Sequence, residues 1–205
     1  SRSEFVANRF KNYLVESVLD VGCYEAPLRE MLSPTPYMGI DIAGNPDKVI
    51  DLEKTEKLPF DDKQFKCVIC IDVLEHLDNL HSMFAELIRV SNSYIVVSLP
   101  NCWRDARQPI ERGIGNFRHY GLPAEKPLDR HKWFFNITEA KQFIESKKEE
   151  FGISLAELFV TEKPKNALLR TIRKIRYCGE KYQNRYSQTL WVVMKKFLSV
   201  FLSKF

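Results

Sequence analysis

Short apolar runs recur along the first hundred residues, and a polar turn or a segment with helical spacing separates each run from the next. Runs rich in Val, Ile and Leu that stop at Gly, Asp or Pro are typical of strands buried on both faces of a parallel sheet. The pattern predicts five such strands, at 18–21, 37–42, 48–52, 66–71 and 94–99.

Segments with helical periodicity alternate with these runs and predict helices at 4–14, 26–32 and 79–90. Asn136, followed three residues later by Glu139, predicts a capped helix that reaches about residue 150. Two later runs predict strands at 153–161 and 189–194. The alternation is typical of an α/β fold with a mainly parallel sheet and helices on its faces. A length of 205 residues fits a single domain, 1–205.

The periodicity disappears between residues 101 and 135, where aromatic residues, five arginines and several glycines and prolines stand close together. Long irregular segments inside compact domains usually have a functional reason. We therefore expect 101–135 to be an insert that faces the substrate. Its aromatic residues, Trp103 and Trp133 among them, could form a platform for a sugar or lipid, or could simply anchor a long loop.

The positive charge of the chain is concentrated in one segment. The net charge is +4, yet 163–187 holds eight lysines and arginines against one acid, Glu180, so the rest of the chain is net negative. Leu168 and Ile172 recur at helical spacing here, which predicts a basic helical insert. With the apolar tail at 195–205, this surface could lie on an anionic membrane; alternatively, it could be a solvated face, pack on the core or form a dimer interface.

Cysteine usage and hydropathy favour a protein of the cytoplasm. No apolar run approaches the roughly 20 residues that cross a bilayer, and the first residues lack a signal-peptide pattern. The five cysteines are scattered rather than arranged as a disulfide framework. Cys67 and Cys70 lie three apart in a predicted strand and point to opposite faces, so we expect buried cysteines and predict no metal site.

Gly22 directly follows the first predicted strand, and Asp41 ends the second, which is the layout of a nucleoside-binding βαβ unit. A dinucleotide site needs further glycines so that the backbone can approach a pyrophosphate. Here those places hold residues 23–26, Cys-Tyr-Glu-Ala, and Glu25 would repel phosphate. The turn therefore favours an adenosine ligand without phosphates, of which S-adenosylmethionine is the common example.

Four segments resemble the class I S-adenosylmethionine-dependent methyltransferases: Val-Leu-Asp-Val-Gly-Cys at 18–23, Gly-Ile-Asp-Ile at 39–42, Leu-Pro-Phe-Asp at 58–61 and Asp-Val-Leu-Glu-His-Leu at 72–77. The resemblance implies a Rossmann-like sheet that is mostly parallel with an antiparallel last strand, and S-adenosylmethionine as cofactor. Only nine residues separate Asp41 from Asp51, fewer than a helical crossover needs, so we predict that the helix between the second and third strands is missing.

Carried over by motif position, the resemblance implies a set of cofactor contacts that runs from the methionine end to the adenine: Asp20, Gly22, Tyr24, Asp41, Ile42, Asp51, Leu52 and Asp72. Asp41 is expected at the ribose, although an acid there could also cap a turn. Asp72 is expected at the rim after the fourth strand, or as a helix cap together with Glu75. Tyr24 and Ala26 depart from the family's glycine-rich turn.

The segments 98–101, Ser-Leu-Pro-Asn, and 129–136, Asp-Arg-His-Lys-Trp-Phe-Phe-Asn, are similar to methyltransferases of bacterial surface-polysaccharide and lipid-linked pathways. This resemblance implies methyl transfer to a small or lipid-linked acceptor, with a sugar hydroxyl in cell-surface glycan biosynthesis as the expected target. An RNA methyltransferase is the alternative, although no RNA-binding motif accompanies the basic segment and we expect no nucleic-acid partner. A cofactor-binding scaffold that has lost catalysis is the third hypothesis.

Two histidines in the insert are candidate general bases for an acceptor hydroxyl. His131, preceded by Asp129 and Arg130, is one, and His119 beside Tyr120 is the other. Either could instead stack on the substrate or hold the loop by hydrogen bonds. His76 is a secondary candidate. Methyl transfer from a sulfonium depends mainly on in-line positioning, so a base is not obligatory.

Overall fold

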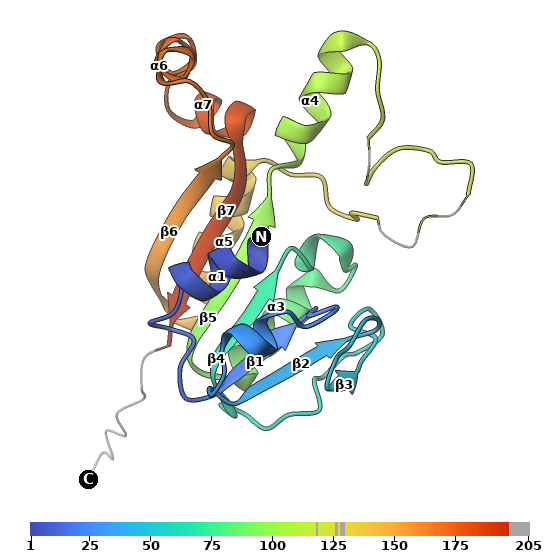
Figure 1. Cartoon of the computed structure of the whole chain (residues 1–205), viewed down its shortest axis with the longest axis vertical. Coiled ribbons are helices and arrows are strands. Elements are labelled where there is room, and N and C mark those ends of the chain that lie inside the picture. The colour runs from blue at the N-terminus through green and yellow to red at the C-terminus, as the bar shows by residue number, and fades with distance from the viewer. Residues whose placement is uncertain (118, 126, 128–129, 197–205) are drawn as a thin grey trace.

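The computed structural model describes residues 1–117, 119–125, 127 and 130–196. Within them the strands form one sheet in the order β3-β2-β1-β4-β5-β7-β6 (Figure 1). The strands are β1 (Val18–Val21), β2 (Tyr37–Asp41), β3 (Lys48–Val49), β4 (Phe65–Ile71), β5 (Ser91–Pro100), β6 (Ser154–Glu162) and β7 (Ser187–Lys195). Neighbours from β3 to β5 pair in parallel, whereas β7 lies antiparallel between β5 and β6. The predicted mostly parallel sheet with an antiparallel last strand is confirmed.

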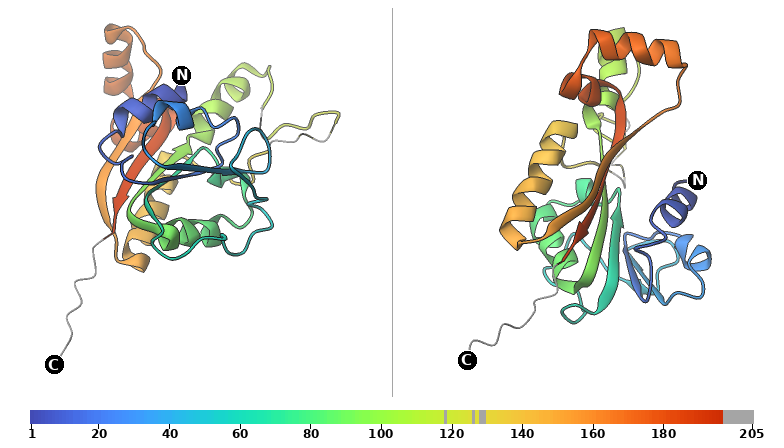
Figure 2. Two further views of the ribbon diagram at one scale, coloured as in Figure 1. Left: turned by 60° about the horizontal axis from the view of Figure 1, so that its bottom comes forward. Right: turned by 90° about the vertical axis from the view of Figure 1, so that its left-hand side faces the viewer.

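Helices cover both faces of this sheet, as the alternation of patterns predicted. The bounds are α1 (Arg2–Arg9), α2 (Leu28–Met31), α3 (Leu80–Val90) and α5 (Ile137–Phe151). Apolar residues of α3 and α5 pack with one face of the sheet in one core cluster, and those of α1 and α2 pack with the other face in a second cluster. The right-hand view of Figure 2 shows the two helical layers on opposite sides. α5 begins at the predicted cap, where Asn136 and Glu139 bond reciprocally.

Between β2 and β3 the described chain contains no helix, so that prediction is also confirmed. The connection is a tight loop in which the Asp47 carboxylate accepts a hydrogen bond of 2.7 Å from the amide of Gly39. Two local predictions were too long. The strand predicted at 48–52 pairs only over Lys48–Val49, and the helix predicted at 26–32 is a single turn.

The expectation that 101–135 is wholly irregular was wrong, because helix α4 (Cys102–Arg112) follows β5 directly. Asn101 caps this helix by accepting a hydrogen bond from the amide of Arg104. The sequence did not predict this helix because it contains Pro109 and many charged residues. Only two of its residues, Cys102 and Ala106, are buried. The described residues from 113 to 136 have no regular helix or strand.

The basic segment contains two helices, α6 (Ala167–Arg176) and α7 (Gly179–Tyr186). In Figure 1 these helices and α4 stand beyond one end of the sheet. None of the residues of α6 is buried. In the described part of the chain, no helix has the length and apolar character needed to cross a bilayer. The predicted tail contact falls largely on residues 197–205, outside the described residues.

Candidate functional site

The carboxyl ends of β1, β2 and β4 meet at one edge of the sheet, because β1 pairs in parallel with both neighbours. Gly22 follows β1, Asp41 ends β2 and Asp72 follows β4. Ligands of parallel α/β sheets bind at this edge. The structure thus brings together three of the residues that the sequence predicted for the cofactor.

Gly22 leaves the strand with a φ of +81°, a conformation that residues with a Cβ rarely adopt. A Cβ at this position would stand 2.2 Å from Cγ2 of Val73, the residue that follows Asp72. The turn after β1 therefore packs directly against the turn after β4. Only glycine permits this close approach of the two turns.

Tyr24 and Ala26, the departures from a glycine-rich turn, keep a left-handed backbone with φ values of +46° and +49°. The turn has therefore kept the conformation that glycine would favour, at some cost in backbone strain. The side chain of Tyr24 is 61% exposed, whereas that of Ala26 is buried. Tyr24 and Ala26 therefore change the side chains that the turn presents and keep its backbone conformation.

The Asp41 carboxylate holds this turn in place. It accepts hydrogen bonds of 2.8 Å from the amide of Tyr24, 2.6 Å from that of Ile42 and 3.1 Å from that of Ala43. Asp41 therefore caps the turn in the structure, which was the alternative to a ribose contact. A carboxylate in this place still lies on the nucleoside edge of the sheet, so ribose recognition by Asp41 remains a prediction. The side chain of the adjacent Ile42 is exposed there.

Asp20 is a buried acid at the end of β1. The hydroxyl of Tyr37 donates a hydrogen bond of 2.6 Å to its Oδ2. The pKa of Asp20 is raised to about 7: burial is the main cause, the Tyr37 hydrogen bond opposes the rise, and the nearby charge of Asp41 adds to it. A cationic ligand would favour the ionised form of such a carboxyl. This acid fits a cofactor that carries a sulfonium and an ammonium group.

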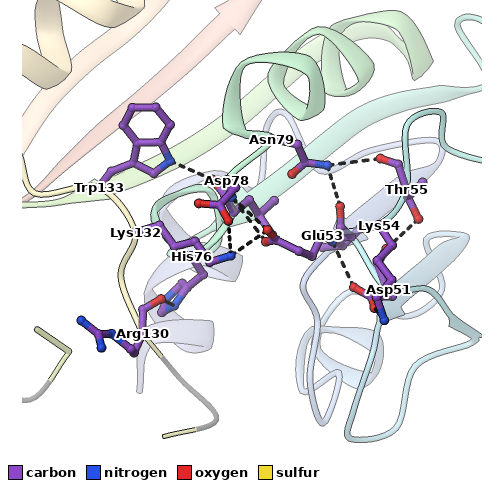
Figure 3. A network of polar contacts seen from close by, with 12 residues as sticks. Asp51, Glu53, Lys54, Thr55, His76, Asp78, Asn79, Arg130, Lys132 and Trp133 are labelled. Carbon is purple, nitrogen blue, oxygen red and sulfur yellow. Dashed lines mark hydrogen bonds and ion pairs between the residues drawn. The ribbon is translucent and has the colours of Figure 1, made fainter. Parts of the chain in front are cut away.

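Asp51 and Leu52, predicted at the adenine, lie in the loop after β3; Figure 3 shows Asp51 there. The Asp51 carboxylate bonds the amide of Glu53 at 3.1 Å and pairs with Lys54 at 3.1 Å, and the Lys54 interaction lowers the pKa of Asp51. The Leu52 side chain is buried in the core, and its carbonyl accepts a hydrogen bond of 2.9 Å from Asn79. Adenine contact by this loop remains a prediction.

Asp72 has a φ of +55° and is held from three directions at the end of β4. Its amide donates to the hydroxyl of Ser98 at 3.0 Å, and that hydroxyl donates back to Oδ1 at 2.6 Å. Its Oδ2 pairs with Arg2 of α1, whose guanidinium lies 5.0 Å from the ring centroid of Trp191. No pattern in the sequence indicated Arg2, since only folding brings α1 to this rim.

Three histidines from distant parts of the chain gather beside this edge. The rings of His119 and His131 stack with centroids 4.2 Å apart, and His76 lies 4.6 Å from His131. Nδ1 of His131 is 2.9 Å from the hydroxyl of Tyr120. Both predicted bases are therefore in one cluster, together with the secondary candidate His76. Asp129 lies outside the described residues.

The segment 130–133 crosses the turn after β4 as a strap (Figure 3). The amide of Lys132 donates to the carbonyl of Glu75 at 2.8 Å, and its ammonium bonds Glu53 at 2.7 Å and Asp78 at 2.6 Å. The indole of Trp133 donates to the carbonyl of Leu77 at 2.7 Å. These contacts favour the anchoring interpretation of Trp133.

Beyond the strap, a groove of about 630 Å³ runs between α4 and α7. Its lining is mainly apolar and aromatic, and includes Trp103, Ile110 and Phe134. An adjoining recess of about 290 Å³ is lined by many basic residues: Arg104, Arg107, Lys163, Lys165, Arg170, Arg173 and Arg185. The sequence predicted the basic insert but missed the groove, which needs α4.

Comparisons with known proteins agree with this geometry. Residues 3–146 match the family described as "Methyltransferase domain". A methyltransferase structure from Bacillus halodurans C-125 is similar over 95% of this chain and 100% of its own, with 14% identity and a TM-score of 0.58. The small RNA methyltransferase HEN1 is similar over 97% of this chain and 25% of its own, with 15% identity and a TM-score of 0.63.

Magnesium protoporphyrin IX methyltransferase from Synechocystis PCC 6803, with bound S-adenosylhomocysteine, is similar over 96% of this chain and 82% of its own, with 16% identity and a TM-score of 0.56. At such identities these structures share the fold with this chain and say nothing of its acceptor. No curated protein sequence matches the chain.

Proposed function

The chain belongs to the methyltransferase domain family, and from this premise we propose that it methylates a hydroxyl of a lipid-linked, negatively charged acceptor, with a sugar as the methylated group. Membership makes the protein an S-adenosylmethionine-dependent methyltransferase. The cofactor supplies a methyl group on a sulfonium; the acceptor oxygen forms the new bond, the carbon–sulfur electrons stay on sulfur, and the hydroxyl proton is released.

The groove between α4 and α7 is the observation that supports this acceptor. Its apolar wall suits a hydrocarbon chain, and the basic recess shares Arg107 and Arg185 with it. An acceptor with a lipid tail next to a phosphate would place the tail in the groove and the phosphate among the arginines. The groove adjoins the strap that carries His131, so a sugar beyond the phosphate could extend toward the cofactor edge.

The same surface supports peripheral contact with an anionic membrane. On α6, Leu168 is 67% exposed, Ile172 53% and Ile175 79%, and basic residues surround them. Apolar side chains among basic ones favour helices that lie in a membrane interface. A lipid-linked acceptor resides in such an interface, so membrane contact would bring the enzyme to its acceptor.

Transfer of a radioactive methyl group tests the acceptor. We expect label from S-adenosylmethionine in polyprenyl-phosphate-linked sugars, and little in free sugars or short RNA. Trp103→Ala in the groove and Lys165→Glu in the recess should raise KM for the lipid-linked acceptor while leaving affinity for S-adenosylhomocysteine unchanged. Lys11→Glu, which reverses the charge of an exposed residue just after α1, is the control. Equal labelling of free sugars, or no effect of both variants, would refute the proposal.

Sedimentation with vesicles tests the membrane contact. The protein should sediment with vesicles that contain phosphatidylglycerol and not with pure phosphatidylcholine. Leu168→Ser with Ile172→Ser should weaken this binding, whereas Val49→Ser, which removes an apolar side chain that is 72% exposed on edge strand β3, should not. Binding that the α6 pair leaves unchanged would exclude α6 as the contact.

An RNA acceptor is the second candidate, because the basic recess would also attract a nucleic-acid backbone and the fold is shared with the small RNA methyltransferase HEN1. In the transfer assay this candidate predicts labelled RNA and a steep loss of binding with salt. Labelled RNA in place of labelled lipid would establish it.

A further inference from the structure

Glu75, His76 and His131 each offer one ligand atom to a common point, and these atoms all lie within 4.8 Å of one another. Two of the residues are neighbours in the short helix η1 (Leu74–His76), and the third comes from the strap more than fifty positions later in the chain. We propose that this cluster binds a divalent metal ion. The proposal departs from the expectation, drawn from cysteine spacing, that the protein has no metal site.

Hydrogen bonds at Nδ1 set the tautomer of each imidazole. Nδ1 of His76 is 3.2 Å from the carbonyl of Arg130, which can only accept, so Nδ1 carries the proton. The Tyr120 hydroxyl lies 2.7 Å from the carbonyl of Trp133 and 2.8 Å from Sγ of Cys102; with its single proton on either of these acceptors, it accepts from Nδ1 of His131 at 2.9 Å. In both neutral rings Nε2 therefore has the lone pair that a metal ion requires, as in ligating histidines held by an outer hydrogen bond.

The third ligand is held as firmly. Glu75 is 1% exposed, and its Oε1 lies 3.9 Å from Nε2 of His76. The Glu75 carbonyl accepts from the amides of Lys132, at 2.8 Å, and Trp133, at 3.4 Å, which ties η1 to the strap directly after His131. The ion pairs of Lys132 with Glu53 and Asp78 fasten the same strap. The backbone thus places the three ligands together before any metal arrives.

The donor set determines which ion would bind. Two imidazoles and one carboxylate suit Mn²⁺, Fe²⁺, Co²⁺ or Zn²⁺ better than Ca²⁺, which prefers oxygen ligands alone. Three protein ligands leave coordination positions for other oxygen atoms. The cluster follows Asp72 by only a few residues and lies on the same rim as the cofactor edge.

This placement also gives the ion a role in methyl transfer, and that role rests on the proposed function. An acceptor hydroxyl bound at an open position would have a lowered pKa and a fixed direction toward the methyl group. Its proton would leave to solvent as the carbon–oxygen bond forms and the carbon–sulfur bond breaks. The metal would then replace the general base that the sequence assigned to His131 or His119.

Binding of Mn²⁺ to the whole protein, without cofactor or acceptor, tests the site directly. Loss of the spin-resonance signal of free Mn²⁺ should give one site per chain. Glu75→Gln, which keeps the shape of the side chain, and His131→Ala should each weaken binding at least about tenfold. His81→Gln on α3 is the matched control, because His81 is exposed and lies outside the cluster.

Thermal unfolding in the presence of EDTA separates loss of a ligand from loss of the fold, since a folded variant that does not bind Mn²⁺ supports the site. Absence of a single site in the intact protein, or unchanged binding in both folded variants, would overturn the proposal. The result does not depend on the acceptor, so a failure of the lipid-linked proposal and a failure of the metal proposal can be told apart. If the metal site is present, EDTA should also abolish methyl transfer, and Mn²⁺ should restore it.

Discussion

Replacing Tyr24 by glycine should stabilise the protein, because the native backbone at this position has a φ of +46°. A residue with a Cβ pays about 1–2 kcal/mol in the left-handed region, and glycine does not. Glycine in turn gives the unfolded chain more freedom, which offsets about 0.5–1 kcal/mol. The side chain is 61% exposed, so its removal costs little burial. The net expectation is a gain of about 0.5–1 kcal/mol.

Ala26 has the same backbone strain, with a φ of +49°, but a different balance. Its methyl group is buried, and loss of one buried methyl costs about 0.8 kcal/mol. Ala26→Gly should therefore change stability by less than about 0.5 kcal/mol. Comparison of the two sites separates the backbone term, which both share, from the burial term, which only Ala26 has.

Urea unfolding measures these differences, and Tyr24→Ala is the matched control because it removes the ring and keeps the Cβ. With a slope of about 2 kcal/mol per M, Tyr24→Gly should raise the midpoint by roughly 0.25–0.5 M, and Tyr24→Ala should leave it nearly unchanged. If alanine stabilises as much as glycine, the ring and not the backbone is responsible. If glycine destabilises the protein, the strain argument is wrong.

Three further predictions concern the cofactor edge and the core. Gly22→Ala should cost at least about 2 kcal/mol and abolish binding of S-adenosylhomocysteine in calorimetry, because its Cβ would stand 2.2 Å from Val73 and force the two turns apart; binding of normal affinity would show that cofactor binding does not depend on this close packing. Asp20 has a folded pKa of about 7, above its unfolded value, so the unfolded chain binds fewer protons between these two values. The free energy of unfolding should therefore fall by up to about 4 kcal/mol from about pH 4 to pH 7. Asp20→Asn should lack that fall in urea unfolding at pH 5 and pH 8, and an equal fall in both proteins would assign it to other groups. Arg89→Met should cost about 2–3 kcal/mol in the same assay, because Arg89 bonds Glu86, Asp62 and the carbonyls of Leu58 and Phe60, and a cost below about 0.5 kcal/mol would show that this network is solvated.

Local pattern was sufficient for the central sheet. Strand β1 lies where the run at 18–21 predicted it, and β4 differs from its prediction by one residue. These strands are buried on both faces, so nearly every side chain in them must be apolar, and the run is visible in the sequence. The missing crossover between β2 and β3 could also be predicted, because chain length alone limits what nine residues can span.

The same local reasoning failed where burial is partial. α4 buries only Cys102 and Ala106, and the few apolar residues at helical spacing stand among charged ones and Pro109, so its stripe is a weak signal in the sequence. Without α4 the groove beside α7 could not be anticipated, although Trp103 and Ile110 were visible as apolar residues. A helix that stands beyond the sheet is specified by its cap and its few contacts, and these are weak signals in a single sequence.

For the site, the sequence was sufficient to predict where the expected cofactor residues gather. Gly22, Asp41 and Asp72 each end or follow a parallel strand, and parallel strands present their carboxyl ends at one edge whatever the details of packing. The remaining contacts arise from tertiary packing alone. The pairing of Arg2 with Asp72, and the meeting of Glu75 and His76 with His131, join segments far apart in the chain. Such contacts depend on how helices and the strap pack across the sheet edge, and no spacing along the chain encodes that packing.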